Sequence, residues 1–91
     1  IYVAGAFWME FVIGGKKYKL TLDEIRCGVR NLEPEPVRKY YVEIDGKNYP
    51  IKQVISEILG IPRIIFTSMY AYGVLERLGI KVKTRNFLRE N

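Results

Sequence analysis

Basic and aromatic side chains recur at spacings that suit contact with nucleic acid. In an expected helix over residues 66–80, Tyr70 and Arg77 are seven positions apart and share one side, with Ser68 and Tyr72 beside them. Arginine can bind phosphate or guanine, and tyrosine can stack on a base or form a hydrogen bond. The alternative is that the tyrosines pack against the rest of the domain and expose only their hydroxyl groups.

Gly73 lies on the same side of this expected helix. A glycine in a helix interior costs about 1 kcal/mol relative to alanine, so it usually indicates that something approaches the backbone closely. The approaching group would be a phosphate backbone, a base edge or the second hairpin of the chain itself.

A phosphate site is also predicted at the start of the preceding helix. Lys52 falls in its first turn, where the helix dipole disfavours a cation, and a bound anion would relieve that conflict. Lys47 precedes it in a hairpin, Gln53 is its neighbour, and Tyr49 cannot cap the helix N–H groups. In the alternative, Lys52 extends into water and those N–H groups bind solvent.

The C-terminal segment is basic. Lys81 and Lys83 would project from one side of a strand, with Arg85 following. Such a strand resembles the wing of a winged helix, or is an edge strand protected by lysines. The predicted nucleic-acid-binding residues are thus Lys47, Lys52, Gln53, Ser68, Tyr70, Tyr72, Arg77, Lys81, Lys83 and Arg85.

Catalysis is not indicated. The chain has one cysteine, Cys27, and no histidine, which excludes an intrachain disulfide, zinc sites built from cysteine and histidine, and histidine acid–base chemistry. Gly14 and Gly15 belong to a hairpin and not to a phosphate-binding loop. We therefore expect no enzyme, no metal site, no cofactor and no small-molecule substrate.

Size and charge favour one small binding domain. The 91 residues are 48% hydrophobic, enough for a single core, and 15 Lys and Arg against 10 Asp and Glu give a net charge of +5 that favours polyanionic partners. Residues 1–8 form an apolar extension, non-native or an edge strand, and the apolar stretch over residues 1–13 is too short to cross a membrane. Residues 9–84 form the domain and 85–91 a basic tail. The scarcity of Cys and Gln favours a cytoplasmic protein from a thermophilic prokaryote.

Turn and cap signals locate the elements that would position these residues. Gly14-Gly15 and Asp45-Gly46 predict two hairpin turns, and Thr21 with Glu24 fits a helix capping box. The expected elements are a hairpin over residues 10–20, a helix over 22–31, a hairpin over 38–49, a helix with Pro50 at its first position and Gly60 as its cap, a last helix capped by Thr67 or Ser68 and ending at Gly79, and a strand over 81–83.

Together these elements predict an α+β fold, a small antiparallel sheet of hairpins with three helices, the last two of them helix-turn-helix-like. The link between these two helices, residues 60–66, is longer than the usual three or four residues. A winged-helix geometry is therefore an analogy.

The stretch of residues 41–80 resembles a small domain of short stand-alone prokaryotic proteins and of the N-terminal region of some McrA-like, HNH-type, modification-dependent endonucleases. The matching positions are Asp45-Gly46-Lys47, Tyr49-Pro50, Lys52-Gln53-Val54, Gly60-Ile61, Phe66-Thr67-Ser68, Ala71, Val74-Leu75 and Leu78-Gly79. The His-Asn-His set of the nuclease is missing, so no catalytic activity carries over. The resemblance implies an accessory or targeting module in prokaryotic defence or regulation.

The sequence thus favours nucleic-acid binding, with DNA preferred over RNA. One alternative is a protein-interaction or homodimerisation module that uses Tyr70, Tyr72, Phe87 and residues 1–8. Another is a ribosome-associated RNA-binding protein.

Overall fold

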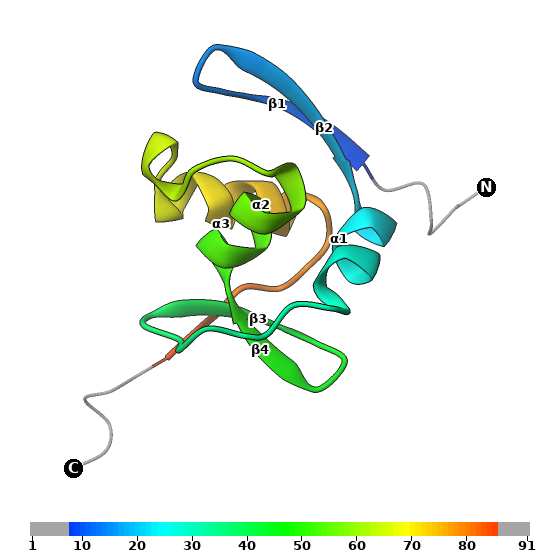
Figure 1. Ribbon diagram of the computed structural model, residues 1–91, viewed down its shortest axis with the longest axis vertical. Coiled ribbons are helices and arrows are strands. Elements are labelled where there is room, and N and C mark those ends of the chain that lie inside the picture. The colour runs from blue at the N-terminus through cyan, green and yellow to red at the C-terminus, as the bar shows by residue number, and fades with distance from the viewer. Residues whose placement is uncertain (1–7, 86–91) are drawn as a thin grey trace.

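Two small antiparallel sheets lie on opposite sides of the helices (Figure 1). The computed structural model describes residues 8–85. The elements are β1 (Trp8–Ile13), β2 (Lys16–Thr21), α1 (Leu22–Val29), β3 (Tyr40–Ile44), β4 (Lys47–Pro50), α2 (Ile51–Leu59), the 3₁₀ helix η2 (Arg63–Ile65), α3 (Ser68–Arg77) and β5 (Lys83–Thr84). The predicted α+β class with three helices is confirmed. The apolar extension at residues 1–7 and the tail at residues 86–91 lie outside this description, while Trp8 begins β1.

The two hairpins belong to separate sheets, which corrects the expectation of one sheet. Within residues 8–85, β1 pairs with β2 alone, and β3 pairs with β4 on one side and β5 on the other. The reason is the connection over residues 30–39, which is bonded to α2 through Gln53 and carries the chain to the far side of that helix before β3 begins.

Both hairpin turns are of the tight two-residue kind that the sequence predicts. Gly14 and Gly15 have φ of 60° and 80°, and Asp45 and Gly46 have 53° and 80°. Two successive residues with positive φ fit the type I′ turn, whose twist matches that of the strands. β5 is shorter than expected and starts at Lys83, although Val82 is buried between exposed lysines.

The helix caps are also as predicted, to within one or two residues. Thr21 and Glu24 form the capping box of α1, which ends at Val29. Pro50 is the residue before α2 and not its first position. Gly60, with φ of 70°, ends α2, and Thr67 caps α3 by accepting a hydrogen bond from the Tyr70 N–H group.

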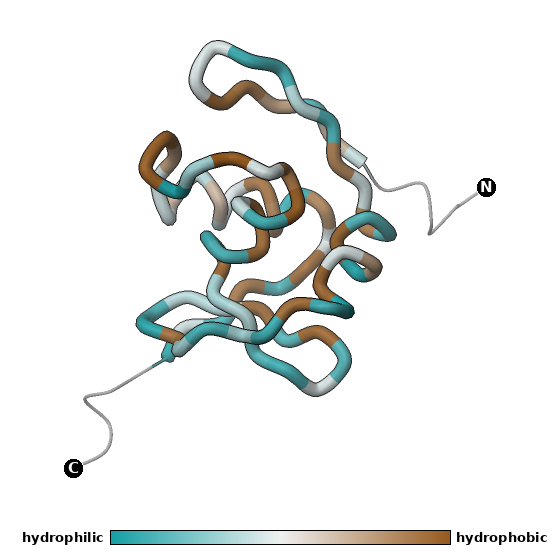
Figure 2. The backbone as a smooth tube through the Cα atoms, in the orientation of Figure 1, coloured by the Kyte–Doolittle hydropathy of each residue, from teal (hydrophilic) through white to brown (hydrophobic). Residues whose placement is uncertain are grey.

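The core fills the space between the two sheets, where hydrophobic segments of strands and helices meet (Figure 2). Ala71, Val74, Leu75 and Leu78 form the inner side of α3, and all four are buried. α1 and α2 approach closely at Gly28, where a Cβ would lie 2.8 Å from Ile58 Cγ1. α2 and α3 pack together, and their description as a helix-turn-helix pair stays a prediction.

Candidate nucleic-acid interface

A cavity of about 420 Å³ opens where the segment before β3 meets the beginnings of α2 and α3. Its lining includes three of the predicted ligand-binding residues, Lys52, Gln53 and Ser68. The opposite wall comes from residues 35–40 and adds Arg38, Lys39 and Tyr40, and Arg63 of η2 closes one side. The fold therefore brings together cations from distant parts of the sequence.

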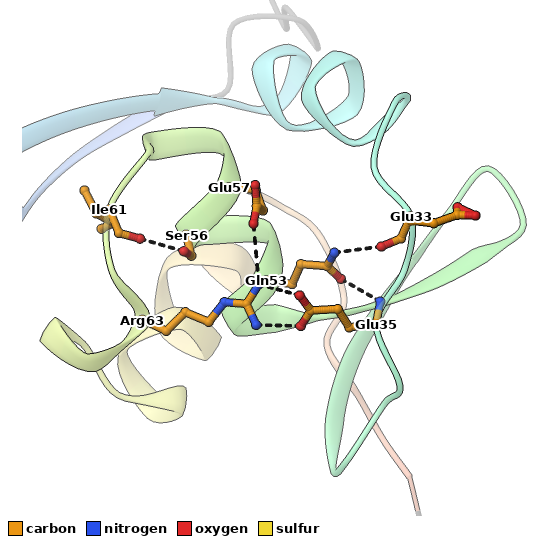
Figure 3. Close-up of polar contacts among 7 residues, drawn as sticks. All are labelled: Glu33, Glu35, Gln53, Ser56, Glu57, Ile61 and Arg63. Carbon is orange, nitrogen blue, oxygen red and sulfur yellow. Dashed lines mark hydrogen bonds and ion pairs between the residues drawn. The ribbon is translucent and has the colours of Figure 1, made fainter.

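Gln53 has a structural role beside this cavity, and its role as a ligand contact stays a prediction. Its side chain is 3% exposed, and its amide is used at both ends (Figure 3). Nε2 donates to the Glu33 carbonyl at 2.8 Å, and Oε1 accepts from the Glu35 N–H at 3.0 Å. Gln53 thus fastens the cavity wall to α2.

Arg63 fastens the same wall from the other side. Its guanidinium donates two hydrogen bonds to the Glu35 carboxylate, at 2.5 and 2.6 Å, and lies 3.5 Å from Glu57 (Figure 3). The hydrogen bonds from Arg63 lower the pKa of Glu35 below its ordinary value of 4.5, against a smaller opposing effect of burial. They raise the pKa of Arg63 in turn.

Glu35→Gln is expected to lower the free energy of unfolding by less than about 1 kcal/mol at pH 7, because both partners are well exposed to solvent. Since the folded-state pKa of Glu35 is lowered, its contribution is present above the ordinary value of 4.5 and is lost as the pH falls through the lower folded value. Urea unfolding at pH 7 and near pH 3 measures this difference. Glu57→Gln is the matched control and should lower the free energy of unfolding by less than Glu35→Gln does. If Glu35→Gln lowered the free energy of unfolding equally at both pH values, the lowered pKa of Glu35 would be contradicted.

Three cations in the cavity are not neutralised by carboxylates. Within residues 8–85, Arg38, Lys39 and Lys52 form no ion pair. Lys39 Nζ lies 5.2 Å from the centre of the Tyr40 ring, and Lys52 Nζ lies 5.2 Å from that of Phe66. The first turn of α2 has no acidic residue and no side-chain cap. The cavity consequently presents excess positive charge.

The chain after β5 places Arg85 against residues 37 and 39, although Arg85 is not one of the residues that line the cavity. The Arg85 N–H donates to the Lys39 carbonyl at 2.6 Å, and its guanidinium donates to the Val37 carbonyl at 2.9 Å. Lys83, by contrast, is engaged by Glu43 at 2.8 Å, and this hydrogen bond raises the pKa of Lys83 and lowers that of Glu43. Lys83 and Lys81 line a different cavity of about 430 Å³, where acidic residues also lie.

The outer side of α3 does not join the cavity as a unit. Tyr70 packs on the first hairpin, where its hydroxyl donates to the Val12 carbonyl at 2.7 Å. Tyr72 packs edge-on against Tyr40, with ring centres 5.5 Å apart. Both rings thus pack within the domain, as in the alternative interpretation, although Tyr70 is 38% exposed and its hydroxyl is hydrogen-bonded. Arg77, like Lys47 of β4, is exposed and does not line the cavity.

Gly73 is not crowded by the rest of the chain. A Cβ built at this position meets nothing within 4 Å in the described structure. The reading in which the second hairpin approaches this glycine is therefore wrong, and a small stretch of α3 backbone is open to solvent.

Sequence reasoning missed Arg38, Lys39 and Arg63 as residues of this site. The sequence predicts a strand that starts at Arg38 and includes Lys39, whereas β3 begins two residues later, at Tyr40. The run Arg-Lys-Tyr-Tyr joins two cations to two aromatic residues. This combination was the signal that could have revealed the site.

In the described part of the chain, no group of three or more Cys, Asp or Glu side chains is placed to hold a metal ion. Over the same residues, no helix combines the length and the apolar character that a membrane span requires.

Neither a curated protein nor a solved structure matches the sequence. The resemblance to McrA-like endonucleases gains no support from these comparisons. Residues 9–90 match the family described as SCO5918-like, and the chain therefore belongs to that family.

Proposed function

We propose that this domain binds nucleic acid through the cavity between residues 35–40 and the start of α2. The observation that carries the proposal is the excess positive charge of Arg38, Lys39 and Lys52, which no carboxylate in residues 8–85 neutralises. Cations that do not engage protein carboxylates are available to replace the counterions of a phosphate backbone. Arg85, whose N–H group donates to the Lys39 carbonyl, lies next to this site.

The net charge of +5 supports association with a polyanion in general, and the cavity is the site that we propose for it. Glu35, the carboxylate in the cavity lining, is occupied by Arg63. A role as an accessory or targeting module in defence or regulation, and the preference for DNA over RNA, rest on the resemblance of residues 41–80 and on no contact described above.

The test is a comparison of two triple variants that remove the same charge. Arg38→Gln, Lys39→Gln and Lys52→Gln neutralise the cavity, whereas Lys16→Gln, Lys17→Gln and Lys19→Gln neutralise three exposed lysines of the distant β2 strand. We expect the cavity variant to reduce the slope of log affinity against log salt by about 2 to 3, and the β2 variant to change it little. Fluorescence anisotropy with labelled single-stranded and duplex DNA and RNA measures both slopes.

Equal losses in the two triple variants would show that binding follows net charge and has no site at the cavity. Absence of binding to every probe at low salt would refute the proposed function altogether.

A protein-interaction function is a second candidate because several apolar side chains are exposed near the tip of the first hairpin. Val12, Ile65 and Tyr70 line a shallow hollow, and Ile64 and Met69 beside them in the sequence are 89% and 57% exposed. This differs from the surface that the sequence favours, since Tyr72 packs on Tyr40 and Phe87 and residues 1–7 lie outside the description. Light scattering over a concentration series tests it, because a monomer at all concentrations would exclude homodimerisation.

A further inference from the structure

The cavity has an apolar wall as well as a basic rim. Pro36, Tyr40, Pro50 and Ile51 contribute to its lining together with the three uncompensated cations. Its volume of about 420 Å³ falls within the range of about 300 to 1,000 Å³ that is typical of pockets for small organic groups. A bare phosphate would use the cations and leave this apolar wall unfilled.

We propose that the cavity receives one unpaired nucleotide of a single strand, its base against Tyr40 and its phosphate between Lys39 and Lys52. This inference rests on the proposed function and specifies its ligand. In a duplex the bases are stacked inside, so that phosphates and groove edges alone face a protein, whereas a single strand presents base faces and phosphates together. A recess with one aromatic wall and a cationic rim matches the single strand.

The Tyr40 ring is supported by a contact with α3. The Tyr72 ring meets it edge-on at 5.5 Å with an interplanar angle of 90°, so that a residue of α3 supports a residue of β3. Lys39 Nζ lies over the Tyr40 ring and Lys52 Nζ lies over the buried Phe66 ring. Each ammonium is thus beside the recess but bound to no carboxylate, and can turn to an incoming phosphate.

The same geometry predicts weak base selectivity. Gln53 is the cavity residue best suited to read a base edge, and both ends of its amide are bonded to the backbone of residues 33 and 35. Stacking on an aromatic ring accepts any base, because every base has an aromatic face. Oligomers of different base composition should therefore bind with affinities within a few-fold of one another.

The experiment measures the affinity of the full chain for labelled oligo-dT and oligo-dA single strands and for a duplex of equal length at low salt. We expect single strands to bind at least about 10-fold more tightly than the duplex. Tyr40→Leu should weaken single-strand binding by about 5- to 150-fold, which is the range of one lost base stack, and leave duplex binding unchanged. Tyr40→Phe, which keeps the ring, should restore the affinity.

Tyr41→Leu is the matched control, since Tyr41 follows Tyr40 on β3 and projects from the opposite side of the strand. It should leave binding unchanged. If Tyr40→Leu does not fold, amide chemical shifts of the unmodified protein titrated with a nucleoside 5′-monophosphate give the same test, with shifts expected at residues 38–40 and 52. Shifts elsewhere would overturn the inference.

Failure of the inference differs from failure of the proposed function. In one outcome the duplex binds as tightly as the single strand, Tyr40→Leu has no effect, and the cavity cations are still required. That outcome would overturn the inference of a bound unpaired nucleotide but would leave the proposed nucleic-acid binding intact. Loss of binding to every probe would refute both. If a free nucleotide bound more tightly than any oligomer, the ligand would be a small molecule and not a strand. This result would also overturn the inference.

Discussion

Gln53→Met is expected to lower the free energy of unfolding by about 2 kcal/mol. Methionine keeps the length and the helix propensity of glutamine but leaves the Glu33 carbonyl and the Glu35 N–H without their partner. Both groups are partly buried, so water replaces the lost bonds incompletely. Urea denaturation followed by circular dichroism measures the change.

The neighbouring substitution Lys52→Met is the control for Gln53→Met. Lys52 is half-buried at the same end of α2 and contacts the Phe66 ring through its ammonium, and its replacement should change stability by less than about 0.5 kcal/mol. The two variants should therefore separate stability from ligand binding. If Gln53→Met weakened nucleic-acid binding without a change in stability, the result would support a direct contact between Gln53 and the ligand.

Gly28→Ala is expected to destabilise the protein by up to about 2 kcal/mol. Alanine favours a helix by about 1 kcal/mol over glycine, but its Cβ would lie 2.8 Å from Ile58 Cγ1 and 3.1 Å from its Cδ1. Overpacking of this kind costs about 1 to 3 kcal/mol and outweighs the gain in propensity, because α1 must move away from α2. Thermal and urea unfolding measure the loss.

The sign of the effect should reverse when Ile58 is shortened. In an Ile58→Ala background the nearest remaining atom is Cβ at 3.8 Å, so Gly28→Ala should become neutral or stabilising. Gly73→Ala is a second control. It adds the same methyl group to open space in α3 and should stabilise the fold by about 0.5 to 1 kcal/mol. Similar effects at Gly28 and Gly73 would show that the contact with Ile58 is unimportant.

The parts of the fold that follow from the sequence are those fixed by neighbouring residues. The type I′ turns at Gly14 and Gly46 and the caps at Thr21, Gly60 and Thr67 depend on a few consecutive backbone angles and hydrogen bonds. Local chemistry determines them, so their residue types were sufficient. The apolar stripes of α2 and α3 were equally legible, because helical periodicity alone selects the inner side.

The separation of the two sheets could not be read in the same way. It depends on the path of residues 30–39, which Gln53 and Arg63 bind to α2 from positions 18 to 28 residues later in the chain. A buried glutamine looks the same in the sequence as an exposed one. Gly28 likewise gave no signal, since its partner Ile58 lies on another helix.

The candidate site was predicted in fragments for the same reason. Lys52 and Ser68 do lie together, but the tertiary structure replaces Lys47 and Arg77 by Arg38 and Lys39 as their companions. Charge and residue type identified cations suited to phosphate. Which cations share a surface depends on how residues 30–39 cross α2. The pattern of neighbouring residues in the sequence does not predict that crossing.

The hydrogen bond from Tyr70 to Val12 joins residues 58 positions apart, so it can form only after most of the domain has been synthesised. The first hairpin leaves the ribosome early, whereas the helix that supplies this bond is synthesised near the end of the domain. A two-stranded hairpin is marginally stable by itself in water. Phe11 and Ile13 are therefore covered by α3 only late in the synthesis of this domain, and the first hairpin is among the last of its elements to become stable.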